Sequence, residues 1–163
     1  MLPKGHAGFN MALTAPLVAL YPGKLYDMQL WLFIATFIAA STWPDIDLRF
    51  ETKHRGFTHT LAGALTFGLL TALLVGMLDQ AYAPIGFLGG FLGTLGHMLG
   101  DLLTYTKFRP LWPLSGKKFG LGLYRADNPK LNNFFARIGP LLFTVAILYR
   151  ELLPLQQILL SHY

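Results

Sequence analysis

Residues 84–105 read PIGFLGGFLGTLGHMLGDLLTY, and this stretch decides the fold that we expect. It approaches the roughly 20 residues that an α-helix needs to cross a bilayer core of about 30 Å. Its glycines recur as Gly89-xxx-Gly93 and Gly96-xxx-Gly100, a spacing that lets helix backbones approach closely inside lipid. A merely flexible glycine-rich segment is the alternative, but the flanking residues are uniformly apolar. We therefore expect a helix at the centre of a membrane bundle.

Four more apolar stretches accompany the central one, at 7–22, 28–43, 61–78 and 138–153. Charged residues make up only 13% of the chain, against roughly 25% in soluble domains, and the mean hydropathy is +0.46. We expect an all-α fold, a multi-span integral membrane helical bundle of about four to five membrane helices, in a single domain that covers 1–163. The number of complete spans stays open because only 61–78 and 84–105 approach the required length.

The loops are expected to place most of the basic residues on one side of the membrane. The short link at 79–83 makes a tight hairpin of the third and fourth stretches, and a second hairpin through 21–27 brings the N-terminus to the same side as the loops at 44–60 and 106–137. That side carries eleven of the thirteen basic residues: Lys4, Arg49, Lys53, Arg55, Lys107, Arg109, Lys117, Lys118, Arg125, Lys130 and Arg137. The positive-inside rule makes it cytoplasmic. We expect a multi-pass protein of the cell inner (cytoplasmic) membrane, with the lipid bilayer and no nucleic acid as its partner.

Polar residues with metal-binding chemistry occur at the helix ends. The chain has no cysteine, so any metal must be held by histidine and carboxylate. His97 and Asp101 lie four residues apart and share one helix face, where they can bind a metal or, as the alternative, form a hydrogen bond that pins two helices. Asp45 and Asp47 follow Pro44, so that one can ligate while the other orients a ligand, unless both belong to a solvated helix end.

A dense polar cluster lies just before the third stretch, in residues 54–60 (HRGFTHT). Imidazole is the commonest side-chain ligand for zinc-like ions, and arginine is suited to bidentate binding of phosphate oxygens. The alternative is an interfacial loop that contacts lipid headgroups, with Thr58 as a candidate helix cap. His6 adds a further imidazole on the same side. Four of the five histidines and three carboxylates are thus expected at one depth.

These motifs resemble a known family, the YdjM-like inner-membrane metal-dependent hydrolases. The resemblance rests on Gly5-His6, Pro44-Asp45-Ile46-Asp47, the run 54–60, His97-xxx-Asp101 with Thr104, and Leu111-Trp112-Pro113. The order and spacing are also similar, more distantly, to the zinc-dependent phospholipase C and single-strand nuclease group. That similarity implies His6 and Asp45 as ligands of one ion, and His59, His97 and Asp101 as ligands of another. The implied cofactor is a divalent metal, zinc in the first place and manganese as the alternative.

The leading functional hypothesis is a metal-dependent hydrolase that acts on a phospholipid or another phosphoester at the cytoplasmic interface. Its catalytic candidates are Asp47, as general base or orienter of a ligand, Arg55, which steadies charge on a phosphoryl oxygen, and His54. The basic loop 107–130 either covers the site and attracts anionic headgroups or serves topology alone. The alternatives are a metal-binding transporter component, which would place ligands at mid-membrane, and a structural membrane protein with a helix-clamping metal, which would leave no open coordination position.

Overall fold

The computed structural model describes residues 1–48 and 55–160, and this part of the chain is all-helical apart from its loops. The five α-helices are α1 (Pro3–Leu20), α2 (Met28–Ala40), α3 (Leu61–Gly76), α4 (Ala83–Leu102) and α5 (Pro129–Leu160). Three short 3-10 helices accompany them: η1 (Pro44–Leu48), η2 (Phe57–His59) and η3 (Gln80–Tyr82). Within the described ranges, extended pairing is limited to two isolated bridges. The expected all-α class is confirmed.

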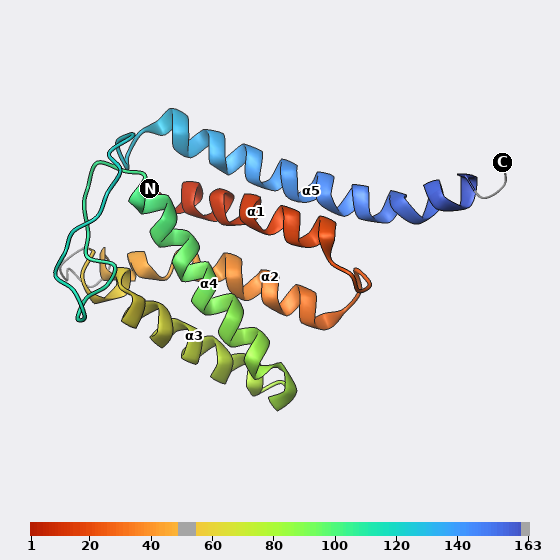
Figure 1. The fold of residues 1–163 in the computed structure, drawn as a ribbon, viewed down its shortest axis with the longest axis horizontal. Helices are drawn as coiled ribbons and strands as arrows, with labels where there is room; N and C mark the ends of the chain where they lie inside the picture. The colour runs from red at the N-terminus through yellow and green to blue at the C-terminus, as the bar shows by residue number, and fades with distance from the viewer. Residues whose placement is uncertain (49–54, 161–163) are drawn as a thin grey trace.

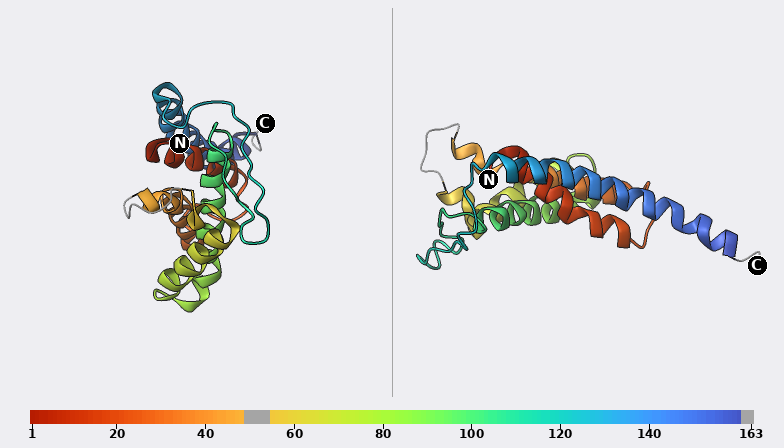
Figure 2. Two further views of the ribbon diagram at one scale, coloured as in Figure 1. Left: turned by 90° about the vertical axis from the view of Figure 1, so that its left-hand side faces the viewer. Right: turned by 90° about the horizontal axis from the view of Figure 1, so that it is seen from above.

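The helices form a bundle in which α4 contacts α1, α2 and α3, while α5 lies along α1 (Figures 1 and 2). The N-terminus, η1, η2 and the segment 103–128 gather at one end of the bundle, which we call the site end (Figure 1). The links at 21–27 and 77–82 lie at the opposite end of their helices. The side-by-side placement of the polar loops agrees with the hairpin argument from the sequence.

Glycines let α4 approach its neighbours closely. At Gly93 an added Cβ would lie 2.2 Å from the carbonyl oxygen of Phe37 in α2, and at Gly90 it would lie 1.9 Å from Thr71 Oγ1 in α3. Any larger residue at these positions would push the helices apart. The expectation of a central, glycine-packed helix is confirmed.

The start of α3 differs in detail from the sequence expectation. Thr60 is the N-cap residue, since its hydroxyl oxygen accepts a hydrogen bond from the backbone N–H of Gly63 at 3.0 Å. Thr58 was the candidate cap, and that assignment is wrong because Thr58 lies inside η2 and bonds to other partners.

The last helix begins earlier than expected. The loop predicted to run to 137 ends at Asn128, whose side-chain oxygen accepts hydrogen bonds from the backbone N–H groups of Lys130 and Leu131 at 3.0 and 3.3 Å. Pro129 follows as the first helical residue, a position that its fixed φ angle favours. Polar residues lower the hydropathy of the first turns of α5, so a prediction from hydropathy alone begins the helix too late. The signals for the true start, Asn128 and Pro129, are nevertheless present in the sequence.

One described helix is long and apolar enough, by length and composition, to cross a bilayer: residues Pro129–Leu152, which contain an 18-residue window with a mean hydropathy of 1.5. The segment Leu61–Gly76 is apolar but shorter. Many large apolar side chains on α3 and α5 are nevertheless exposed, including Leu69 at 64% and Leu73 at 67%.

Candidate metal centre

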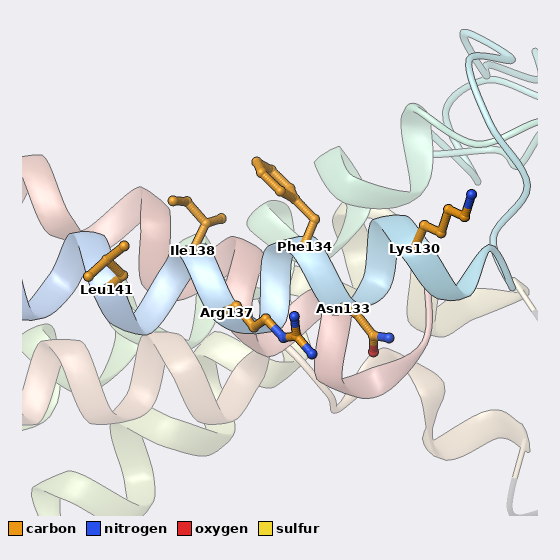
Figure 3. A pocket seen from close by; sticks show the side chains of 6 residues that line it. All are labelled: Lys130, Asn133, Phe134, Arg137, Ile138 and Leu141. Carbon is orange, nitrogen blue, oxygen red and sulfur yellow. The ribbon is translucent and has the colours of Figure 1, made fainter.

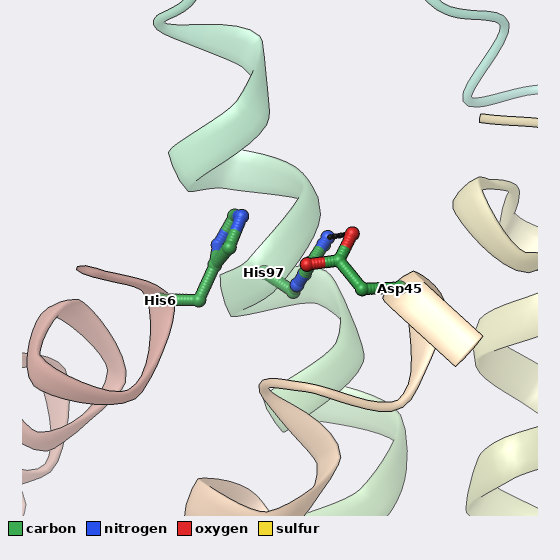
Figure 4. Close-up of side chains that lie close together, drawn as sticks. All are labelled: His6, Asp45 and His97. Atoms are coloured by element: carbon green, nitrogen blue, oxygen red, sulfur yellow. Dashed lines mark ion pairs between the residues drawn. The ribbon is translucent and has the colours of Figure 1, made fainter. Parts of the chain in front are cut away.

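The five side chains that the resemblance implies as metal ligands come together at the site end. His6 comes from α1, Asp45 from η1, His59 from η2, and His97 and Asp101 from α4. All five are buried, with relative exposures between 0% and 9%. Figure 4 shows His6, Asp45 and His97 converging from three separate elements. Two groups of three could each hold an ion: His6, Asp45 and His97, and His59, His97 and Asp101.

The ligand atoms have the spacing of a coordination sphere. The Nε2 atoms of His59 and His97 lie 3.1 Å apart, and Asp101 Oδ2 lies 3.4 Å from the first and 3.8 Å from the second. Asp45 Oδ1 lies 3.6 Å from both nitrogens. Ligands of a tetrahedral zinc ion, with bonds of about 2.0–2.1 Å, are separated by about 3.3 Å. The donor set therefore fits a divalent ion such as zinc.

The His97 ring is oriented by a backbone carbonyl behind it. Its Nδ1 lies 2.6 Å from the carbonyl oxygen of Ser41, which can only accept, so the ring proton is on Nδ1 and the lone pair is on Nε2. Metal-binding histidines are commonly fixed in this way. Ser41 was not predicted from the sequence, because a carbonyl contact carries no residue-type signal.

Thr58 and Asp47 orient His59 in a similar manner. The Thr58 hydroxyl donates to Asp47 Oδ2 at 2.9 Å and lies 3.0 Å from His59 Nδ1. Because the single hydroxyl proton is directed at Asp47, the ring donates its Nδ1 proton to Thr58, and its Nε2 faces His97. The two Nε2 atoms lie 3.1 Å apart, so either a proton on one ring or a metal ion between them would keep two lone pairs from facing each other. Asp47 thus lies behind His59 and not beside the gathered ligand atoms.

His6 completes the cluster from the N-terminal side. Its ring stacks on that of His97, with centroids 3.6 Å apart, and its Nε2 lies 3.3 Å from Asp101 Oδ1. Both ring nitrogens are buried, and apart from this Asp101 contact neither has a polar partner within the described residues. A buried polar atom without a partner costs about 1–3 kcal/mol, which a bound ion would recover.

Arg55 reaches the centre from a strained backbone position. Its φ angle of 59° is in the left-handed region that non-glycine residues rarely adopt, and its backbone N–H donates to Asp47 Oδ2 at 3.0 Å. Its guanidinium lies 3.0 Å from Asp101 Oδ1 and also donates to Thr104 Oγ1. The amino nitrogen of Met1 lies 2.5 Å from the same Asp101 oxygen. One oxygen of Asp101 therefore faces positive charge, and the other faces the imidazole pair.

His54, the remaining catalytic candidate, lies outside the described residues.

The surroundings of the His59 imidazole favour its protonated, positively charged form. Burial lowers the pKa of its imidazole, but hydrogen bonding to the Asp101 and Asp45 carboxylates outweighs burial and raises the pKa above its ordinary value. The same carboxylates would attract a metal cation to the same place. At the rim, burial and the Asp101 charge raise the pKa of Tyr124 to about 12, so its phenol stays protonated.

The family model described as YdjM inner membrane protein matches residues 1–160. The chain is 31% identical over 132 residues to the inner membrane protein YdjM of Escherichia coli (strain K12), and equally to that of Shigella flexneri. Each match covers 69% of this chain and 66% of the relative, so it spans just under two thirds of the relatives' length. No solved structure matches the chain.

Proposed function

The chain belongs to the YdjM inner membrane protein family, and we propose that it is a membrane-bound metal-dependent hydrolase acting on a phosphoester or phospholipid-like substrate at the cytoplasmic interface. Family membership makes it an inner membrane protein that associates with the lipid bilayer. One observation carries the hydrolase proposal. Imidazole and carboxylate atoms from four separate elements face one another at 3.1–3.8 Å in a buried site.

We assign the ligands in two sets. His6 and Asp45 serve one ion, and His59, His97 and Asp101 serve the other, with zinc as the first choice of metal and manganese as the second. The nitrogen and oxygen donors suit both metals, and the close approach of the two Nε2 atoms supports a cation between them. The shared contacts of His97 with Asp45 and Asp101 bring the two sets together.

The residues around the centre have separate tasks. A divalent ion in this site would act as a Lewis acid and lower the pKa of a water molecule, which phosphoester hydrolysis requires at neutral pH. Arg55 presents a guanidinium that can bind phosphoryl oxygens and stabilise the negative charge that develops there. Asp47 acts through Thr58 to hold the His59 ring with its Nε2 directed inward, which favours the orienting role over that of general base.

We further propose a multi-pass arrangement with the centre facing the cytoplasm. Exposed leucines on α3 and α5 support contact with lipid, since soluble monomers rarely expose large contiguous apolar surfaces. Among the described residues, six basic side chains belong to the site-end segments, and Lys4 and Lys130 lie in the first turns of the helices that begin there, as the positive-inside rule requires of a cytoplasmic face: Arg55, Lys107, Arg109, Lys117, Lys118 and Arg125 are the six. Lys24 and Arg150 belong to the far end, where Arg150 donates to the carbonyl oxygen of Gly23 at 3.0 Å.

A structural clamp is the second candidate. The ligand-type residues come from α1, η1, η2 and α4, so a bound ion would tie four elements together whether or not it catalyses a reaction. Both candidates require metal, and only the hydrolase requires turnover.

Elemental analysis of detergent-purified protein tests the centre. We expect the wild type to contain zinc or manganese and both His59→Ala and Asp101→Ala to lose it. Thr94→Val is the matched control, since Thr94 is equally buried in α4 and, within the described residues, its hydroxyl bonds only to the carbonyl oxygen of Gly90 in its own helix. Full metal content in both site variants would show that the proposed site is wrong.

Turnover of a chromogenic phosphodiester by the same samples then separates the two candidates. Hydrolysis by the wild type and by Thr94→Val, but not by the two site variants, supports the hydrolase. If the wild type contains metal that both site variants lose, but no sample hydrolyses the diester, the result supports the structural clamp.

A further inference from the structure

A pocket opens beside the metal centre at the site end. Its volume is about 410 Å³, and its walls come from residues 55–60 and 106–118. This size is within the range of about 300–1,000 Å³ that is typical of small-molecule sites. The pocket is formed by the basic loop after α4, for which the sequence left open whether it covers the site.

Arg55 connects the pocket to the centre. It lines the pocket, yet its guanidinium contacts Asp101 and its side chain is only 6% exposed. The Nε atom of Arg55 is buried and has no hydrogen-bond partner within the described residues. A ligand in the pocket would therefore lie beside a largely buried guanidinium that already contacts Asp101, a candidate ligand of the centre, and whose Nε has no partner among the described residues.

The pocket is strongly positive. Lys107, Arg109 and Lys118 line it together with Arg55, and none of its described lining residues is acidic. These three cations are exposed and have no ion pair within the described part of the chain. By contrast, Arg125 in the same loop is neutralised by Asp127 at 2.9 Å. Three cations without an ion pair, in the same pocket wall as a largely buried guanidinium, favour an anion with several oxygens, such as a phosphate.

The pocket also has an apolar wall. Phe57 and Trp112 line it and are 47% and 44% exposed, and the buried Phe108 lines it as well. Half-exposed aromatic residues are typical of the headgroup level of a membrane. A small free anion would gain nothing from these rings, whereas an amphiphile would place its glycerol and upper acyl carbons on them.

We propose that this pocket binds the phosphate of an anionic lipid, with Arg55, Lys107, Arg109 and Lys118 around the phosphate and with Phe57 and Trp112 against the apolar part of the lipid. The proposal rests on the proposed function, since it names the substrate class of the same centre. It gives Arg55 two roles, in binding the lipid phosphate and in pairing with the metal-site carboxylate.

A binding measurement tests the pocket without relying on turnover. The detergent-purified full chain is titrated with dioctanoyl phosphatidic acid, and lipid binding is followed by native mass spectrometry. The variant Arg109→Ala/Lys118→Ala removes two pocket cations. The control Lys130→Ala/Arg137→Ala removes two cations from a separate hollow on α5, shown in Figure 3. We expect the dissociation constant to rise about 30-fold in the pocket variant and to change little in the control.

Two further ligands distinguish the source of the phosphate. Dioctanoyl phosphatidylcholine has the same chains but a neutral headgroup, and glycerol 3-phosphate has the phosphate without chains. Weak binding of both supports an anionic lipid. Equal binding of glycerol 3-phosphate would overturn the lipid assignment, and equal weakening in the two double variants would show non-specific attraction instead of a pocket.

Metal content, measured on every sample, keeps the two proposals apart. Loss of phosphatidic acid binding with full metal content supports the pocket and leaves the centre intact. A wild type that binds phosphatidic acid through the pocket cations but contains no metal would contradict the proposed function and not the lipid site.

Discussion

Replacing Gly93 with alanine tests how tightly the packing of α4 controls the metal centre. The added Cβ would lie 2.2 Å from the Phe37 carbonyl oxygen, whereas ordinary van der Waals contact begins at 3.4 Å, so the helices must separate by about 1.2 Å. The three nearest atoms all belong to the backbone of α2, and no side-chain rotation can relieve the contact. Overpacking of this kind costs about 1–3 kcal/mol.

The displacement should also reach the centre. Ser41 directly follows α2, and its carbonyl oxygen holds the His97 ring through a contact of 2.6 Å. Moving α2 away from α4 would lengthen that contact and release the ring. Loss of such an orienting partner typically reduces metal affinity about 10–100-fold. We therefore expect Gly93→Ala to lose stability and metal together.

The assay compares Gly93→Ala with Gly76→Ala in detergent, using the free energy of unfolding and the metal content. At Gly76 an added Cβ would meet the Ala83 side chain at 3.1 Å and backbone only at 3.9 Å, so this variant makes the same chemical change at a helical position without the backbone clash. Taking the difference between the variants removes much of the helix-propensity gain of about 1 kcal/mol that alanine brings. Equal stability and equal metal content in the two variants would refute the reasoning.

Two other substitutions test groups that position the site. Thr58→Val preserves the side-chain volume but removes the hydroxyl between Asp47 and His59, so metal affinity measured by competition with a chromophoric chelator should fall about 10–100-fold. Asn132→Leu removes three partly buried hydrogen bonds that join the start of α5 to Leu2 and to the preceding turn, which should lower the free energy of unfolding by about 3 kcal/mol.

Each substitution has a neighbouring control. Thr66→Val removes a hydroxyl that bonds within its own helix on the exposed face of α3, and it should leave metal affinity unchanged. Asn133→Leu removes an exposed contact with Lys4 and should cost little. Equal metal affinities of Thr58→Val and Thr66→Val would contradict the orienting role of Thr58. Equal free energies of unfolding of Asn132→Leu and Asn133→Leu would contradict the stabilising role of Asn132.

Hydropathy predicted the number and order of the helices because each one has an apolar stretch of its own. It placed their ends less well, since hydrogen bonds and caps decide where a helix begins in polar surroundings. Pro129 starts α5 well before the apolar run at 138 because Asn128 caps it, and Asn132 then holds this polar turn against α1. Neither feature changes the hydropathy of the segment.

The grouping of the candidate ligands was partly predictable. Helix periodicity placed His97 beside Asp101, and the hairpin argument brought the loops with Asp45 and His59 to the same end. The orienting contacts were not predictable, because the carbonyl of Ser41 depends on the path of the chain after α2. The reach of Arg55 to Asp101 depends likewise on a left-handed backbone angle that its own sequence does not indicate.

The candidate metal ligands belong to segments that are synthesised at different times. A nascent chain that has emerged through α3 carries His6, Asp45 and His59, but Asp101, the acceptor of the Arg55 guanidinium, is still within the ribosome. His97 likewise belongs to α4, so the five candidate ligands can come together only after the fourth helix has been synthesised. Within the early segments, Asp47 can already accept from Thr58 and from the backbone N–H of Arg55, so the surroundings of His59 can form before the rest of the cluster.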